Sequence, residues 1–134
     1  DIIEMYTQDF DNMFCFGNDA GQGKIEIYQV STNGFWTPHS CPVGTILSVA
    51  RVDANTYLIG HSNGTIYKYE YNINSLTTLI SGVSASCLRF DDVNLQVYAG
   101  EGSTVKRFTY STGALINTVN ASSAVIDLEL LFNK

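Results

Sequence analysis

Parts of the sequence recur at an interval of about 40 residues, and this recurrence limits the possible folds more than any other feature. Residues 45–80 show the unit most clearly, as four short apolar runs separated by turn residues. These runs are Ile46–Val52, Tyr57–Gly60, Thr65–Tyr69 and Leu76–Ile80. β-Branched and aromatic residues bounded by Asn, Asp, Ser and Gly are typical of strands joined by tight turns. The unit is therefore predicted to be a four-stranded antiparallel sheet.

Two further copies of this unit flank it. The downstream copy consists of Leu88–Asp91, Val97–Gly100, Thr104–Phe108 and Leu115–Val119. The upstream copy is less complete and consists of Phe10-Asp11, Phe14–Gly17 and Lys24–Tyr28. The second run of each copy ends in a glycine, and Gly17, Gly60 and Gly100 are spaced 43 and 40 residues apart. A period near 40 residues with four strands per unit is the signature of propeller blades.

The sequence thus predicts an all-β chain that is part of a β-propeller. Three four-stranded antiparallel blades are expected at about residues 1–43, 44–82 and 83–121, followed by the first strand of a fourth blade at 123–132. A generic antiparallel sandwich is the alternative, because it also has short, regularly spaced strands. Closed propellers have about four to eight blades. We therefore expect further chain, another copy or a partner to cover the open ends, and an isolated monomer to be unstable.

An aromatic residue recurs near the end of the third strand, in Tyr28-Gln29, Tyr69-Glu70 and Phe108-Thr109. In this the chain resembles the WD-repeat family of β-propellers over nearly its whole length. The family has a Trp-Asp pair at this point, and the aspartate is not kept here. Gly60-His61 also stands elsewhere in the unit than the family's Gly-His pair, so the family's buried Asp-His-Ser-Trp network is carried over to no residue. The resemblance implies a non-catalytic module without a cofactor that presents loops to protein partners.

The charge balance argues against nucleic-acid binding. The net charge is −6, and the seven Lys and Arg residues are spread along the chain rather than clustered into a basic patch. No apolar run is long enough to span a membrane, and no signal peptide is recognisable. Low charge (15%) and the missing initial Met favour an extracellular or cell-surface location. An odd number of unpaired cysteines favours the cytoplasm instead.

The three cysteines show neither CxxC nor His spacing, which argues against a zinc site and a complete disulfide framework. Cys15 and Cys87 are predicted to be buried in strands. Cys41 lies between Pro38 and Pro42, and we expect it in an exposed loop.

The glycine-rich segment 17–24 is too long between its outer glycines for a phosphate-binding loop, and a predicted strand follows it instead of a helix. A calcium site is the alternative, from the oxygen ligands of Asp9, Asp11, Asn18 and Asp19. EF-hand spacing and its closing Glu are missing, so a long hairpin loop is the preferred interpretation. His39 and His61 have no nucleophile and acid at a recognisable spacing. We expect no catalytic site, metal or cofactor.

Three aromatic residues are candidate partner contacts if they are exposed: Trp36, Tyr67 and Tyr98. Core packing is the alternative for Trp36. Asn63 and Asn120 begin N-glycosylation sequons, although composition alone accounts for two sequons in such a chain. Asn63-Gly64 also predicts a type I′ hairpin turn. The leading functional hypothesis is a protein-interaction scaffold. The alternatives are a self-assembling subunit of a ring or filament, and a glycan-binding propeller.

Overall fold

The computed structural model describes residues 1–131 and contains twelve strands and one short 3₁₀ turn, η1 (Tyr71–Ile73). No helix in this described part is long and apolar enough to cross a bilayer. The strands of the first sheet are β1 (Ile2–Thr7), β2 (Asn12–Asp19), β3 (Gln22–Gln29) and β4 (Gly34–Val43). Those of the second are β5 (Ile46–Arg51), β6 (Thr56–His61), β7 (Thr65–Glu70) and β8 (Ser75–Ser81). Those of the third are β9 (Cys87–Asp91), β10 (Gln96–Glu101), β11 (Thr104–Thr109) and β12 (Leu115–Asn120).

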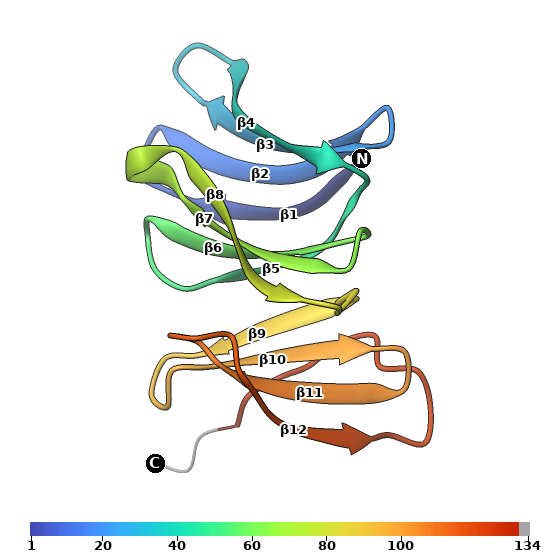
Figure 1. The fold of residues 1–134 in the computed structure, drawn as a ribbon. Helices are drawn as coiled ribbons and strands as arrows, with labels where there is room; N and C mark the ends of the chain where they lie inside the picture. The colour runs from blue at the N-terminus through green and yellow to red at the C-terminus, as the bar shows by residue number, and fades with distance from the viewer. Residues whose placement is uncertain (132–134) are drawn as a thin grey trace.

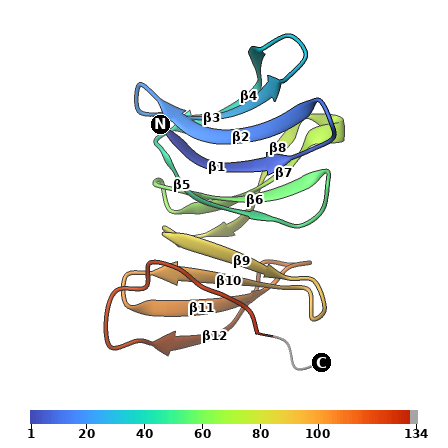
Figure 2. The same cartoon turned by 180° about the vertical axis from the view of Figure 1, so that it is seen from behind.

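Each sheet consists of four consecutive antiparallel strands, with its first and last strands at the two edges. The sheets stack one on the next, as Figures 1 and 2 show, and we call them blades 1, 2 and 3. The first strands β1, β5 and β9 contact one another in turn along one side of the molecule. The predicted all-β architecture of three four-stranded antiparallel blades is confirmed.

Two apolar cores lie between the blades. Between blades 1 and 2 the buried residues are Phe14, Phe16, Ile25, Ile27, Cys41, Ile46, Val49, Tyr57, Ile59, Tyr67 and Tyr69. Between blades 2 and 3 they are Ala50, Leu58, Ile66, Ile80, Val83, Ala85, Leu88, Val97, Ala99 and Phe108. Alternate residues of a strand point to opposite faces, so blade 2 contributes to both cores. Every residue of β6 is buried, whereas every residue of β12 is exposed.

The glycine-rich segment 17–24 is not the long loop that was expected. The strands β2 and β3 continue to Asp19 and Gln22, leaving a turn of only two residues. Ala20 and Gly21 both have positive φ, 49° and 80°. Positive φ at both central residues defines the type I′ turn, whose twist matches that of paired strands. The four oxygen-bearing residues proposed for calcium are therefore separated along a hairpin.

The Asn63-Gly64 turn also differs from prediction. Only Gly64 has positive φ, 85°, and its N–H donates to the carbonyl of His61 at 3.1 Å. Because His61 pairs with Thr65 across three residues, the loop is a type I turn closed by a left-handed glycine, and not type I′. The turn type depends on the loop having three residues instead of two, and the Asn-Gly dipeptide alone does not show the loop length.

Gly60 and Gly100 allow the following segment of chain to approach closely. A methyl group at Gly60 would collide with the backbone of Ala85, and one at Gly100 would collide with the side chain of Val125. Glycine is needed at both points because no Cβ fits there.

Gly17 is not equivalent to these two glycines, although its spacing suggested so. It pairs with Ile2 at the far end of β1, away from blade 2. Asn18 contacts the next blade instead, since its Oδ1 accepts the N–H of Ile46 at 2.7 Å and its Nδ2 donates to the Ile46 carbonyl at 3.0 Å. The strand β2 is longer than β6 and β10, and this difference shifts the register.

An aspartate caps the first hairpin of each blade. The Asp9 carboxylate accepts the backbone N–H groups of two residues that follow it, and Asp53 and Asp91 make similar bonds. In blade 1 this role falls to Asp9, so the predicted match of Phe10-Asp11 with Asp53 is wrong by two residues. Asp11 accepts hydrogen bonds from Ser31 instead.

The segment predicted as the first strand of a fourth blade, 123–132, differs from prediction. No strand follows Asn120 among the described residues, and residue 132 lies outside them. The Val125 N–H donates to the Gly102 carbonyl at 2.7 Å, and the Val125 carbonyl accepts from Ser86 Oγ at 3.1 Å. A strand requires a ladder of bonds to a neighbouring strand. Within residues 1–131 no such neighbour is present on this side of blade 3.

Cys41 is buried, with 2% of its surface exposed, and is not the exposed loop residue that was expected. It belongs to β4, which also contains Pro38 and Pro42. Proline is tolerated there because β4 is an edge strand. The strand carries Cys41 into the core between blades 1 and 2.

Candidate functional site

The three aromatic residues predicted to contact a partner lie in different surroundings. Trp36 is on β4 with 43% of its surface exposed, and Tyr98 is half-buried on β10. Tyr67 is 8% exposed in the core between blades 1 and 2, where its hydroxyl accepts a hydrogen bond from Asn63 Nδ2 at 2.8 Å. Tyr67 is therefore not a surface contact. Blade 2 is covered on both faces, so the alternation along β7 does not leave this face in solvent.

Trp36 belongs to an exposed cluster at the loop end of strands β3 and β4. The cluster, which we call the aromatic hairpin, consists of Tyr28, Val30, Phe35 and Trp36. The rings of Tyr28 and Phe35 are 4.9 Å apart, and Val30 and Phe35 are 55% and 57% exposed. Figures 1 and 2 show this hairpin at the end of the molecule farthest from blade 3.

Strand pairing orients these side chains. Phe35 pairs with Tyr28, and Trp36 pairs with Ile27, so the two adjacent rings lie on opposite faces of β4. The Tyr28 hydroxyl donates to Asn33 Oδ1 at 2.7 Å across the loop. The sequence pointed to Trp36 but not to Tyr28 or Phe35. The available signal was the aromatic pair 35–36 beside a loop rich in Ser, Thr, Asn and Gly.

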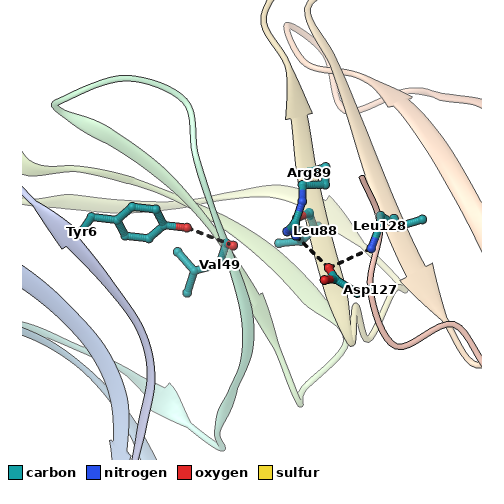
Figure 3. A network of polar contacts seen from close by, with 6 residues as sticks. All are labelled: Tyr6, Val49, Leu88, Arg89, Asp127 and Leu128. Atoms are coloured by element: carbon teal, nitrogen blue, oxygen red, sulfur yellow. Dashed lines mark hydrogen bonds and ion pairs between the residues drawn. The ribbon is translucent and has the colours of Figure 1, made fainter. Parts of the chain in front are cut away.

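A second feature is a groove along the first strands of the blades. It consists of two hollows of about 190 and 270 Å³ on β1, β5 and β9. Charged side chains of both signs line it: Glu4, Arg51, Arg89 and Asp127. Figure 3 shows Arg89 donating to the Leu88 carbonyl at 2.8 Å and to Asp127 Oδ1 at 2.7 Å. This ion pair is largely exposed, so it contributes little to stability.

Tyr6 forms the inner wall of this groove and links two blades. Its hydroxyl donates to the Val49 carbonyl at 3.4 Å, as Figure 3 shows. Burial raises the pKa of Tyr6 to about 12, with a further increase from Glu4 and a smaller opposing effect of Arg89. Tyr6 thus stays neutral at physiological pH and acts as a hydrogen-bond donor between blades.

The two sequon asparagines, Asn63 and Asn120, are both exposed. Asn63 lies in the turn between β6 and β7, as expected, and Asn120 is the last residue of β12. Neither position is covered by a neighbouring strand.

The thiols are shielded. Cys15, Cys41 and Cys87 are all free and buried. Burial raises the pKa of all three, that of Cys41 to about 11. The reactive form of cysteine is the thiolate, so these groups are poor nucleophiles in the folded chain.

The other ionisable groups serve local structure. Hydrogen bonds from Asn12 and Asn94, each to the aspartate that starts its turn, lower the pKa of Asp9 and Asp91. His61 is fully buried, and its Nδ1 accepts the N–H of Asn63 at 3.2 Å. Among the residues that the structure describes, no three His, Cys, Asp or Glu side chains are grouped as metal ligands.

Comparison with known proteins supports the fold but names no family. No protein-family model matches the chain, and no curated protein matches it in sequence. The WD40 β-propeller domain of Doa1 is similar in structure, with a TM-score of 0.76 and 14% identity over 96% of this chain. The RRP9 WD40 repeats (TM-score 0.70, 19% identity, 94% of this chain) and the computationally designed Ika4 protein (0.71, 18%, 99%) are also similar.

The lengths of these neighbours differ from that of this chain. The chain spans 44% of the Doa1 domain, 41% of the RRP9 chain and 81% of Ika4. Such low identity carries information on fold and not on activity. The chain thus has the fold of part of a β-propeller.

Proposed function

We propose that this chain is a non-catalytic β-propeller module that binds a protein partner. The aromatic hairpin is the observation that carries the proposal. It exposes Val30, Phe35 and Trp36 at one end of the β3–β4 hairpin, with Phe35 and Trp36 on opposite faces of β4, and the Tyr28–Asn33 hydrogen bond spans the loop. Clustered exposed apolar residues mark interaction sites, and aromatic residues dominate the energy of protein interfaces.

The WD40 domains among the structural neighbours are consistent with this role by analogy of fold alone. Trp36 has a rigid ring with much exposed surface, and the Tyr28 hydroxyl can form a hydrogen bond at the rim of an interface. The groove along the first strands is lined by charged side chains of both signs, of which Arg89 and Asp127 pair with each other, so we place the partner on the aromatic hairpin.

Photocrosslinking tests the proposal. A photoreactive phenylalanine analogue replaces Phe35 in one variant and Leu115 in a matched control, since both residues are large, apolar and about half exposed. We expect one protein to be crosslinked from position 35 and not from position 115. With that protein purified, Phe35→Ser and Trp36→Ser should weaken binding by about 30-fold each, the effect of losing a hot-spot contact. Leu115→Ser should leave the affinity unchanged.

Equal crosslinking from both positions, or equal affinity of all variants, would contradict the aromatic hairpin as the binding surface. The glycan-binding alternative retains Trp36 but loses Tyr67, which is buried. Quenching of Trp36 fluorescence by oligosaccharides measures sugar binding directly, and a saturable signal would favour a sugar over a protein as the ligand.

A further inference from the structure

The chain contains two Asn-Gly pairs, Asn33-Gly34 and Asn63-Gly64, both in exposed hairpin loops. This dipeptide has a chemistry of its own. The backbone nitrogen of the glycine can attack the Asn side-chain Cγ, because glycine has no Cβ to obstruct the approach. The ring that forms is a succinimide, and asparagine is accordingly one of the thermolabile residues. The surroundings of the two pairs differ in ways that bear on this reaction.

The side chain of Asn63 is held between two groups suited to the chemistry. Its Oδ1 accepts the backbone N–H of Thr65 at 3.1 Å. Its Nδ2 donates to the hydroxyl of Tyr67 at 2.8 Å. A donor on Oδ1 stabilises the negative charge that develops there when Cγ becomes tetrahedral. A phenol beside Nδ2 is placed to give a proton to the departing nitrogen.

Asn33 has a donor on its Oδ1 but no partner at its Nδ2 among the described residues. The donor is the hydroxyl of Tyr28, at 2.7 Å. Its backbone is in the left-handed region, with φ of 50°, and Gly34 pairs with Gln29 at the start of β4. Among residues 1–131, no side chain is therefore placed to give the leaving nitrogen of Asn33 a proton.

We propose that Asn63 is a site of deamidation promoted by its own fold, with Tyr67 as the proton donor. The Gly64 nitrogen bonds to Cγ of Asn63 and loses its proton to solvent. The Cγ–Nδ2 bond breaks, and the nitrogen leaves as ammonia with a proton from Tyr67, which regains one from solvent. Water then opens the succinimide at either carbonyl and leaves an aspartate or an isoaspartate at position 63.

The step has one local requirement. The Gly64 N–H is bonded to the His61 carbonyl at 3.1 Å and must leave it before attack. The loop is exposed at Ser62 and Asn63, so this bond opens without disturbing the strands. The product adds a negative charge, removes the amide bonded to Tyr67 and destroys the sequon. Glycosylation at Nδ2 and deamidation are thus mutually exclusive fates of one nitrogen.

The test follows both Asn-Gly pairs in the same molecule. The full chain is incubated in mildly alkaline buffer, and peptide mapping by mass spectrometry with isoaspartate detection measures the loss of Asn63 and Asn33 over time. The same measurement in urea gives the reference, since the two dipeptides are then equivalent. We expect the Asn63 to Asn33 rate ratio to be about one in urea and well above one in the folded chain. A folded ratio at or below one would overturn the proposal.

Tyr67→Phe separates proton donation from simple restraint. If Tyr67 donates the proton, the variant should lose Asn63 about ten-fold more slowly, a modest part of what positioned acids contribute in enzymes. The rate at Asn33 should not change. If Tyr67 only holds the side chain still, the variant should lose Asn63 faster, which would overturn the assigned role. Should Tyr67→Phe not fold, the comparison of the folded and urea ratios still decides the outcome.

Discussion

Two tyrosines of the core between blades 1 and 2 should respond with opposite sign to loss of their hydroxyl groups. Tyr57 is fully buried, and its hydroxyl has no hydrogen-bond partner among the described residues. Tyr6 packs against it with ring centroids 5.3 Å apart, and its hydroxyl bonds to Val49. The pair thus places one unsatisfied and one satisfied hydroxyl in the same surroundings.

A buried polar group without a partner costs about 1–3 kcal/mol. Tyr57→Phe removes only that oxygen, so we expect the free energy of unfolding to rise by about 1–2 kcal/mol. For a chain of this size that is a rise in Tm of roughly 3–5 °C per kcal/mol. Tyr6→Phe loses a long hydrogen bond, and we expect a fall of about 0.5–1 kcal/mol.

Urea denaturation followed by far-ultraviolet circular dichroism measures both variants, with m compared to confirm that the unfolded state is unchanged. A double variant tests whether the two changes in the free energy of unfolding add, because substitutions at neighbouring residues are often not additive. If Tyr57→Phe lowers stability by more than about 1 kcal/mol, its hydroxyl has a partner and the reasoning fails.

Three further predictions concern burial and ionisation. Leu58→Ala should lower the free energy of unfolding by about 2–5 kcal/mol, whereas Leu115→Ala, at an exposed site, should change it by less than about 0.5 kcal/mol; chemical denaturation distinguishes them. The three thiols should react with a thiol reagent only after unfolding, and rapid labelling of the native chain would refute their burial. Burial raises the pKa of Tyr6 and of Tyr69 from 10.0 to about 12. The free energy of unfolding that depends on their neutral forms is therefore complete below pH 10 and is lost between pH 10 and 12. Measuring the free energy of unfolding across this pH range should show the loss, and the loss should be smaller in Tyr6→Phe.

The periodic pattern of the sequence predicted the blades because each strand carries its own local signal. Runs such as Tyr57–Gly60 and Thr65–Tyr69 combine strand formers with turn residues at their ends, and these signals do not depend on distant contacts. The order of strands within a blade then follows from short connections. The fold class was therefore predictable from single units.

Burial depends on the neighbouring blade, and here the sequence was less informative. Tyr67 looks like an exposed aromatic on an alternating strand, yet blade 1 covers it. Cys41 looks like a loop residue between prolines, yet β4 continues through both prolines as an edge strand. Both errors have one cause, since a repeat pattern shows which residues share a face but not what lies against it.

Register was the second limit. Gly17 matched Gly60 and Gly100 in spacing, but the longer β2 moved it away from the next blade and left Asn18 to make that contact. The side chain of Asn18 carries both a donor and an acceptor, so it can replace a backbone pair. For the candidate site, Trp36 was predictable as an unusual residue beside a loop. The contact of Tyr28 with Phe35 was not, because it depends on the register of β3 with β4.

The position of blade 2 between two cores has a consequence for how the chain opens. In a linear array of repeats, each unit is stabilised by its own contacts and by each interface with a neighbour, so a unit with two interfaces opens last. Blade 2 has both interfaces, and β6 is buried along its whole length. Amide hydrogens of β6 should therefore exchange with solvent only through global unfolding, while those of β12 exchange by local fraying. The chain would then lose its structure from the ends inward, and blade 2 would be the last part to unfold.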